Sequence, residues 1–197
     1  MIRGVNGLDK SWNDKIFALL GIIGPLIAYA SIGLSIYLSP SFSWYKNALS
    51  DLGHARNSSV APIFNLGLLV SGFLTAIYSV RSLINYARYT SISLAFSALM
   101  LQTVATFDEI YGRLHTTVSV LFFVSTGVSC IIYSVERRSM LGVGAFSVGL
   151  LAWLLYWAKV YSAGIAVPEI ISAIAVTSCL IHSALKILGV RCFGSNK

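Results

Sequence analysis

The chain is organised around residues 39–54, which read SPSFSWYKNALSDLGH. This is the longest polar interval between two apolar runs, yet its residues are spaced like those of a helix. Ser43 is a typical N-cap residue and Gly53 is typical just past a helix C-terminus, so we predict a helix over residues 44–52. Its apolar residues would share one face, as in a helix that lies at a membrane surface. The opposite face, turned back toward the protein, would carry Asn47, Ser50, Asp51 and His54.

The composition is that of an integral membrane protein. Of the 197 residues, 56% are hydrophobic and only 11% are charged, which is too apolar for a soluble domain of this size. Apolar runs of about 20 residues can cross the roughly 30 Å of hydrocarbon in a bilayer as helices. We predict an all-α, polytopic six-transmembrane-helix bundle that forms one domain over residues 1–197, with a short interfacial helix between its first two spans. The predicted spans are residues 16–38, 60–80, 91–107, 116–135, 140–158 and 166–188, of which 91–107 is the shortest.

The first apolar run also has features of a secretory signal. A basic N-terminal region and an apolar stretch precede Ala28-Tyr29-Ala30, which resembles a cleavage site. The run continues to a spanning length beyond that point, so we expect a retained first span.

The distribution of basic residues predicts the orientation in the membrane. The net charge is +7, but the basic residues are scattered singly near span ends, which does not favour a nucleic-acid partner. Ten of the 14 Lys and Arg residues fall at the two termini and in the second and fourth connections. The positive-inside rule then places both termini in the cytoplasm of a multi-pass protein of the cell membrane, and the first, third and fifth connections outside.

Most acidic and imidazole side chains fall in the outward connections. The third connection is so short that its flanking spans must form an antiparallel hairpin. Since adjacent span ends are roughly 10 Å apart, we expect the first and third connections to meet and to bring Asp51 or His54 near Asp108 or His115. The outward set comprises Asp51, Asp108, Glu109, Glu169, His54 and His115.

Carboxylate and imidazole groups together can bind zinc or transfer protons. The catalytic candidates are therefore Ser50, Asp51, His54, Asp108 and His115, and the candidate ligands of a divalent metal are Asp51, His54, Asp108 and His115. The spacing matches no recognised metal motif, and charged residues at span ends are commonly just solvated. A binding or structural polar cluster is the alternative, and it adds Asn47, Asn65, Glu109, Arg113, Lys159 and Glu169.

The remaining histidine and the cysteines point to structural roles. His182 lies deep in the last predicted span, where we expect it to bond a hydroxyl or carbonyl of a neighbouring helix. Its separation from His115 disfavours a bis-histidine haem. Cys130, Cys179 and Cys192 include no CxxC pair and no disulfide framework, so we interpret them as small packing residues.

Short motifs resemble a known family. Asn47-Ala48-Leu49-Ser50-Asp51-Leu52-Gly53, followed by Phe64-Asn65-Leu66-Gly67, is similar to the signature of the membrane-protein family named domain of unknown function 998. Phe107-Asp108 followed by His115 resembles the hairpin of that family, although Asp108 stands where a proline is frequent. The resemblance covers about residues 16–188. It implies a six-helix bundle of bacterial or archaeal type, without an established activity, and its candidate residues are Asn47, Ser50, Asp51, Asn65, Asp108 and His115.

Two functional classes remain open at this point. One is a non-catalytic membrane protein that binds a lipid ligand or a membrane-protein partner in the bilayer, with the polar residues as a structural network. The other is a metal-dependent membrane hydrolase or transferase acting on a lipid. Ser50 and His54 with an outlying Asp resemble part of the site of the alkaline ceramidase superfamily, but the chain lacks that superfamily's HxxxH in its last span.

Overall fold

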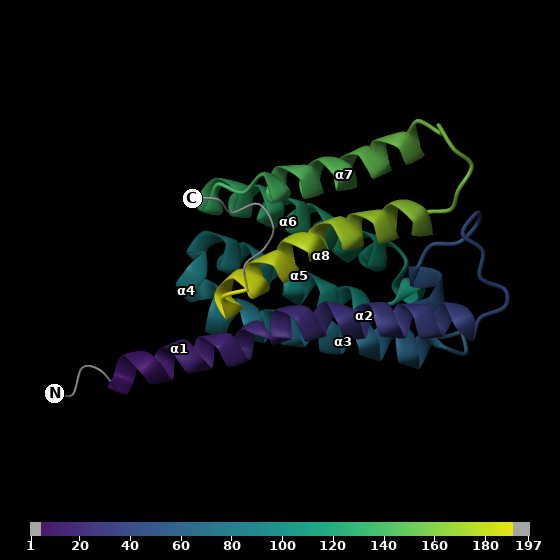
Figure 1. Cartoon of the computed structure of the whole chain (residues 1–197). Helices are drawn as coiled ribbons and strands as arrows, with labels where there is room; N and C mark the ends of the chain where they lie inside the picture. Colours follow the sequence, from purple (N-terminus) through teal and green to yellow (C-terminus); the bar gives the residue numbers. More distant parts are fainter. Residues whose placement is uncertain (1–4, 191–197) are drawn as a thin grey trace.

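The structure, a computed structural model, describes residues 5–190, which contain helices and no strand (Figure 1). Two single turns of 3-10 helix lie in loops, η1 (Ser50–Gly53) and η3 (Glu109–Tyr111), and a π-helical turn, η2 (Ser79–Leu83), follows α3. The α-helices are α1 (Val5–Ala18), α2 (Leu20–Tyr37), α3 (Ala61–Tyr78), α4 (Ile84–Tyr86), α5 (Arg88–Thr106), α6 (Arg113–Arg137), α7 (Met140–Trp157) and α8 (Ala166–Leu188).

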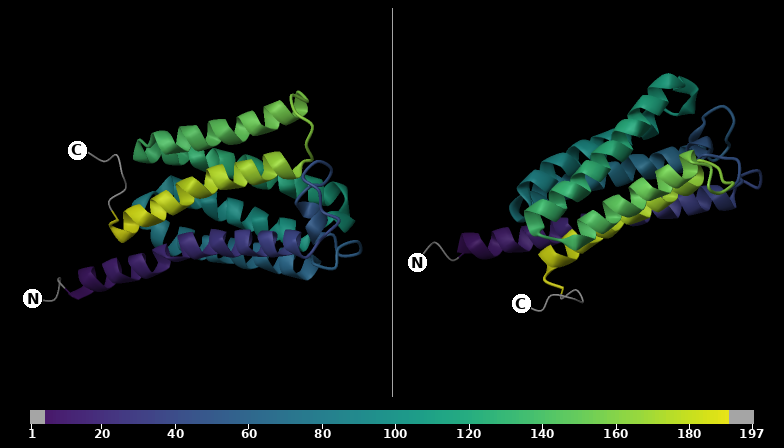
Figure 2. Two further views of the ribbon diagram at one scale, coloured as in Figure 1. Left: turned by 45° about the vertical axis from the view of Figure 1, so that its right-hand side comes forward. Right: turned by 90° about the horizontal axis from the view of Figure 1, so that it is seen from above.

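The long helices run alternately up and down one bundle (Figures 1 and 2). Helix α3 packs against α2 and α5, α6 packs against α5 and α7, and α8 packs against α7. The first, third and fifth connections (residues 38–60, 107–112 and 158–165) gather at one end, here called the loop end. The second and fourth connections (residues 79–87 and 138–139) lie at the opposite end, here called the turn end, where α1 begins and α8 stops.

Among residues 5–190, five helices are long and apolar enough to cross a membrane. Their bounds agree with five of the predicted spans to within six residues, and 166–188 is reproduced as predicted. Helix α5, which contains the predicted span 91–107, does not pass the same criterion. Hydroxyl and amide residues lower the mean hydropathy of α5. They are tolerated because one face of the helix packs against α3 and α6 rather than against lipid. The five candidate spans are Trp12–Tyr37, Ala61–Tyr86, Arg113–Arg137, Met140–Trp157 and Ala166–Leu188.

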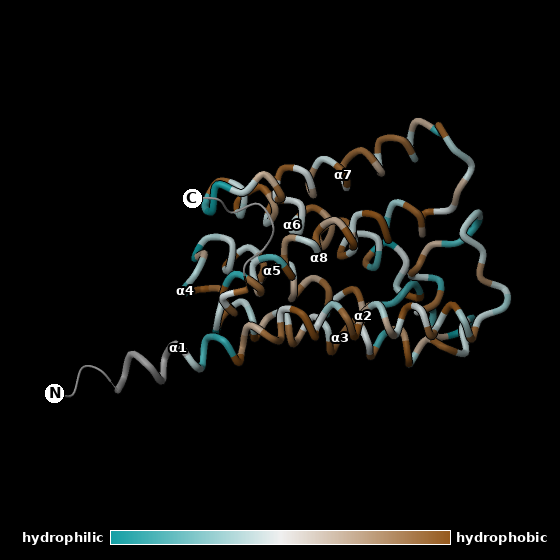
Figure 3. The backbone as a smooth tube through the Cα atoms, in the orientation of Figure 1, coloured by the Kyte–Doolittle hydropathy of each residue, from teal (hydrophilic) through white to brown (hydrophobic). Residues whose placement is uncertain are grey.

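The side chains are distributed as expected for a protein in lipid. Large apolar residues such as Leu26, Phe73 and Val124 are exposed on the helix surfaces. Figure 3 shows stretches of hydrophobic residues along the long helices. The interior instead holds many small hydroxyl residues, for example Ser97 and Ser129, which bond carbonyls or other hydroxyls within the bundle. Lipid gives no hydrophobic drive for burying large side chains, so helices associate through small residues and hydrogen bonds.

Glycine allows two of these helix pairs to approach closely. A Cβ at Gly67 of α3 would collide with the side chain of Ser31 on α2. A Cβ at Gly142 of α7 would collide with the Cys130 carbonyl oxygen of α6. These contacts set the spacing of the bundle, because backbones separated only by glycine pack at the shortest distance.

The turn end is closed by side chains that bond free backbone groups. Glu136 of α6 accepts from the backbone nitrogens of Tyr89 and Thr90 at 3.1 and 2.9 Å and from the Thr90 hydroxyl at 2.7 Å. It thereby satisfies donors in the first turn of α5 that no carbonyl can reach. The hydroxyl of Ser91 bonds the carbonyl oxygen of Ser79 in the π turn at 2.7 Å.

The prediction for His182 is confirmed. Its Nδ1 lies 2.8 Å from the hydroxyl of Tyr133, so the imidazole links α8 to α6. Cys130 and Cys179 are free and buried in the bundle, while Cys192 lies outside the described residues. Some residues of the charge count, such as Arg3, Arg191 and Lys197, also lie outside that range.

The predicted helix over residues 44–52 is wrong. Residues 44–46 form a turn, and regular helical structure is limited to the one 3-10 turn of η1. The physical reason is that helical hydrogen bonds are replaced by bonds to the fifth connection and to the first residue of α8. The carbonyl oxygens of Trp44 and Asn47 accept from the backbone nitrogens of Gly164 and Ala166 at 2.8 and 3.0 Å.

Candidate functional site at the loop end

The first connection is braced by its own polar side chains. Asp51 Oδ2 accepts from Asn47 Nδ2 at 2.6 Å and from the backbone nitrogen of Ala48 at 3.0 Å. Asn47 Oδ1 in turn accepts from the backbone nitrogen of Ser43 at 2.9 Å. Asp51 therefore has bonded partners within its own loop, and its carboxylate also interacts with that of Glu109 in the third connection.

Asn65 anchors the same connection from below. Its Nδ2 donates to the carbonyl oxygen of Gly53 at 2.8 Å. A Cβ at Gly53 would collide with the Asn65 amide and would lie 2.9 Å from the ring of Phe64. The motif glycine is thus required by the close approach of η1 to the first turns of α3.

The first and third connections meet through two hydrogen bonds. Asp108 Oδ2 accepts from the backbone nitrogen of Ala55, and the hydroxyl of Ser50 donates to Glu109 Oε1, both at 3.0 Å. Asp108 also caps η3, because its Oδ1 accepts from the backbone nitrogen of Ile110 at 3.0 Å. Both oxygens of this buried carboxylate are therefore used to hold backbone in place.

The two histidines of the predicted site are in different situations. The buried His115 has its Nδ1 2.7 Å from the carbonyl oxygen of Phe107. Since a carbonyl only accepts, Nδ1 carries a proton and donates it to close the hairpin between α5 and α6. His54 contacts Arg56 and Asn57 of its own loop, at 3.3 and 3.2 Å, and is not joined to Asp108 or His115 by a hydrogen bond.

Glu169 joins the cluster from the first turn of α8. Its Oε2 accepts from the backbone nitrogen of Leu49 at 2.7 Å, a bond between residues 120 positions apart. The carboxylates of Glu109 and Asp51 are near enough to act on it electrostatically. The fifth connection also docks tightly, because a Cβ at Gly164 would collide with the backbone of Asn47. The carboxylates of Asp51, Glu109 and Glu169, from two connections and the start of α8, therefore lie near one another at the loop end.

The environment of Glu109 disfavours its negative charge. Burial and then the neighbouring Asp51 carboxylate raise its pKa above the ordinary value of 4.5, while Ser50 and His115 oppose this shift. Two carboxylates side by side repel each other unless a proton or a cation lies between them. The predicted polar cluster includes two basic residues, Arg113 and Lys159, and the side chains of both are exposed at the surface.

The candidate metal ligands are not gathered into a metal site. Among residues 5–190, no group of three or more His, Cys, Asp and Glu side chains could hold a metal ion. The hydrogen bonds explain this for Asp108 and His115, whose oxygens and Nδ1 already bond the backbone. Ser50 bonds Glu109 and not His54, so these candidates do not form a nucleophile and base pair either.

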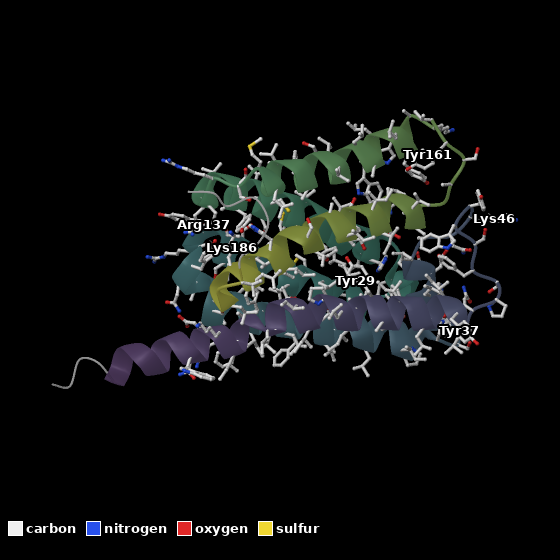
Figure 4. All side chains as sticks on the ribbon, in the orientation of Figure 1. Tyr29, Tyr37, Lys46, Arg137, Tyr161 and Lys186 are labelled. Atoms are coloured by element: carbon white, nitrogen blue, oxygen red, sulfur yellow. The ribbon has the colours of Figure 1, made fainter. Side chains whose placement is uncertain are left out.

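A cavity lies directly beneath the first connection. It has a volume of about 150 Å³ and is surrounded by α2, α3, α5, α6 and α8, and it is partly open. Leu49, Ser50 and Glu169 contribute to its wall at the loop end, and most of the remaining wall is apolar. Tyr29 of α2 also lines it and bonds Thr177 of α8 at 2.8 Å (Figure 4).

The sequence reasoning named Ser50 and Glu169 but missed the other residues that line this cavity. Ser172 is the most informative of them, because its hydroxyl is buried and has no hydrogen-bond partner among the described residues. A signal was present in the last span, where Glu169, Ser172, Ala173, Val176 and Thr177 repeat at helical spacing on one face. Polar residues on one face of an apolar helix indicate an interior or a cavity rather than lipid.

The apolar helices and the buried polar groups define a multi-pass helical membrane protein. The chain belongs to the family described as "Protein of unknown function (DUF998)", whose profile matches residues 22–186. This confirms the resemblance found in the short motifs. Comparison with curated proteins and with solved structures finds no match.

Proposed function

We propose that the protein is a non-catalytic binding protein of the membrane that takes an apolar ligand into the cavity beneath the first connection. The observation that carries this proposal is the position of the cavity. Residues of η1 and of α8 close it at the loop end, and five helices surround it. A cavity of about this volume with apolar walls is large enough to bind a benzene-sized group.

In this proposal, the polar cluster has a structural role, which is to hold the first connection over the cavity. Asn47, Asp51 and Asn65 hold the first connection in shape, and Asp108 and Glu169 tie it to the third connection and to α8. Loops without regular secondary structure keep a defined shape only when their backbone groups are bonded. The network therefore keeps Leu49 and Ser50 in place on the cavity wall.

Filling the cavity tests this proposal. Ala173 lines the cavity on α8, whereas Ala30 is exposed on α2. In purified protein in phosphatidylcholine nanodiscs, we expect the neutral probe 4-phenylbutan-1-ol to bind with one site by calorimetry, after subtraction of empty nanodiscs. Ala173→Leu should weaken binding at least tenfold and Ala30→Leu should leave it unchanged. Equal binding by both variants, or none by the parent protein, would contradict the proposal.

The proposed arrangement in the membrane has six spans, with α5 as the sixth. Support comes from its 19 residues, about 28 Å of helix, and from its packing along α3 and α6. An even number of crossings also agrees with the start of α1 and the end of α8 at the same end of the bundle (Figure 1). We infer one domain with both termini in the cytoplasm and the loop end facing outward from the cell membrane.

Cysteine labelling in intact cells tests this orientation. In a background without the three native cysteines, Ser59→Cys lies in the first connection and Ser139→Cys in the fourth. A membrane-impermeant maleimide should label the first and not the second. Labelling of Ser139→Cys alone would reverse the orientation.

A further inference from the structure

Of the carboxylates that lie near one another at the loop end, Glu169 lies against the cavity, and this combination suggests the charge of the ligand. Glu169 belongs both to the carboxylate cluster and to the cavity wall. Its Oε2 bonds the Leu49 nitrogen, while its Oε1 takes no hydrogen bond from any residue that the structure describes. A charged oxygen beside an apolar space is costly unless a donor or a cation approaches it.

We propose that the ligand is a lipophilic cation, an ammonium group attached to an apolar body, with the ammonium at Glu169 and the body in the cavity. This inference rests on the proposed function of the cavity. Asp51 and Glu109 add negative charge at the same end, so a positive group there relieves repulsion among three carboxylates. An ammonium donates up to three hydrogen bonds, which suits oxygens that come from separate elements.

A metal ion fits these observations less well than an organic cation. Among the described residues, the cluster does not offer three metal-binding side chains in a suitable arrangement. The space next to Glu169 is mainly apolar, and an inorganic ion would leave it unfilled. An apolar amine uses the carboxylates and the cavity together, and burial of its body adds to the affinity.

Ser172 gives an independent indication that the cavity is built for a ligand. It is 5% exposed, its hydroxyl has no partner in the described part of the chain, and it lines the cavity one turn below Glu169. A buried hydroxyl without a partner is unusual, because most such groups are bonded in folded proteins. A ligand that bears a second polar atom about one helical turn from its ammonium would satisfy it.

The test uses three probes with the same apolar body and different charge: 4-phenylbutylamine, 4-phenylbutan-1-ol and 4-phenylbutyrate. Binding is measured by calorimetry at pH 7.5 on the full chain in phosphatidylcholine nanodiscs, with empty nanodiscs subtracted. We expect the amine to bind at least tenfold more tightly than the alcohol, a factor typical of one hydrogen bond to a charged group, and the butyrate to bind most weakly.

The variants assign the charge preference to Glu169. In Glu169→Gln the amine should bind only as tightly as the alcohol, while the affinity of the alcohol should stay unchanged. Glu136→Gln removes a carboxylate at the opposite end of the bundle and should leave all three affinities as in the parent protein. If Glu169→Gln does not fold, Glu109→Gln replaces it, with a loss of amine affinity of about threefold or more expected.

The outcomes separate this inference from the proposed function. Equal binding of amine and alcohol, or an amine affinity unaffected by both loop-end variants, overturns the cationic ligand and leaves the cavity as an apolar site. Failure of all three probes to bind overturns the inference and the proposed function together.

Discussion

Two glutamates at opposite ends of the bundle show how the same side chain can serve different purposes. Glu136 at the turn end accepts three hydrogen bonds from the first turn of α5 and acts as a cap. Glu169 at the loop end accepts one, from Leu49, and its electrostatic neighbours include the carboxylates of Glu109 and Asp51. The two ends can be located in Figure 4 by its labelled residues, with Arg137 and Lys186 at the turn end and Lys46 at the loop end.

The difference between the two glutamates indicates that the charged side chain at the turn end serves stability alone, whereas those at the loop end do not. At the turn end, Glu136 compensates unpaired backbone donors, as a folded protein requires. At the loop end, Asp51 and Glu169 accept hydrogen bonds from backbone nitrogens, and their carboxylates still lie near that of Glu109. Carboxylates whose mutual repulsion is not fully compensated stay close together only where the rest of the fold holds them there. Groups of this kind are common at functional sites.

The largest expected effect comes from breaking the docking of the loop end. Gly164→Val would push a side chain into the backbone of Asn47, so we expect a loss of about 2–3 kcal/mol of unfolding free energy from overpacking. Thermal unfolding of the purified protein in detergent measures this loss. Gly144→Val is the matched control, because nothing lies within 4 Å of a Cβ at Gly144. Similar losses in both variants would show that the docking is not specific.

The second prediction compares the two glutamates directly. Glu136→Gln should lower the unfolding free energy by about 1 kcal/mol, because a charged cap of α5 is weakened. Glu169→Gln should be neutral or stabilising, because the amide oxygen still accepts from Leu49 while a like charge is removed. Denaturation of the two variants side by side gives the sign of each change. A larger loss in Glu169→Gln than in Glu136→Gln would reverse our interpretation of the two ends.

The third prediction concerns pH. The pKa of Glu109 is raised in the folded state, so the folded protein keeps this proton to a higher pH than the unfolded chain does. Its contribution to stability is fully present below pH 4.5 and is lost as the pH rises through the raised pKa. Unfolding midpoints between pH 4 and 8 should fall over that window in the parent protein. Glu109→Gln should flatten this part of the profile, and an unaltered slope would count against the assignment.

The smallest effect is expected at His54. The hydrogen bonds of its side chain stay within residues 54–57 of the first connection, so His54→Ala should change the unfolding free energy by less than about 0.5 kcal/mol. Thermal unfolding and binding of the neutral probe are the two measurements. A loss comparable to that of Glu136→Gln would show that His54 has a partner that matters for the fold.

Much of the fold could be predicted because lipid imposes a simple rule. A chain that crosses hydrocarbon must satisfy its backbone internally, so a long apolar run becomes a helix. The predicted span 140–158 therefore differs from α7 by one residue, and 166–188 matches α8. The predicted meeting of the first and third connections also agrees with the bonds from Ala55 to Asp108 and from Ser50 to Glu109.

The same local reasoning failed over residues 44–52. Their pattern favours a helix, but the backbone nitrogens of Gly164 in the fifth connection and of Ala166 at the start of α8 donate to the carbonyl oxygens of Trp44 and Asn47. Such competition comes from residues far along the chain, and no local propensity records it. The choice of candidate metal ligands had a related weakness, because residue types reveal possible ligands and not whether their atoms are already bonded, as those of Asp108 and His115 are.

The sequence by itself determined the class of protein, its helices and the concentration of carboxylates near one end, because these follow from composition and from hydrophobic run length. Only the tertiary structure decided that Asp51, Glu109 and Glu169 share one place and that a cavity lies beneath them. A cavity is the space that several helices leave between them. Its existence depends on how side chains from five separate helices fit together, which no single stretch of sequence specifies.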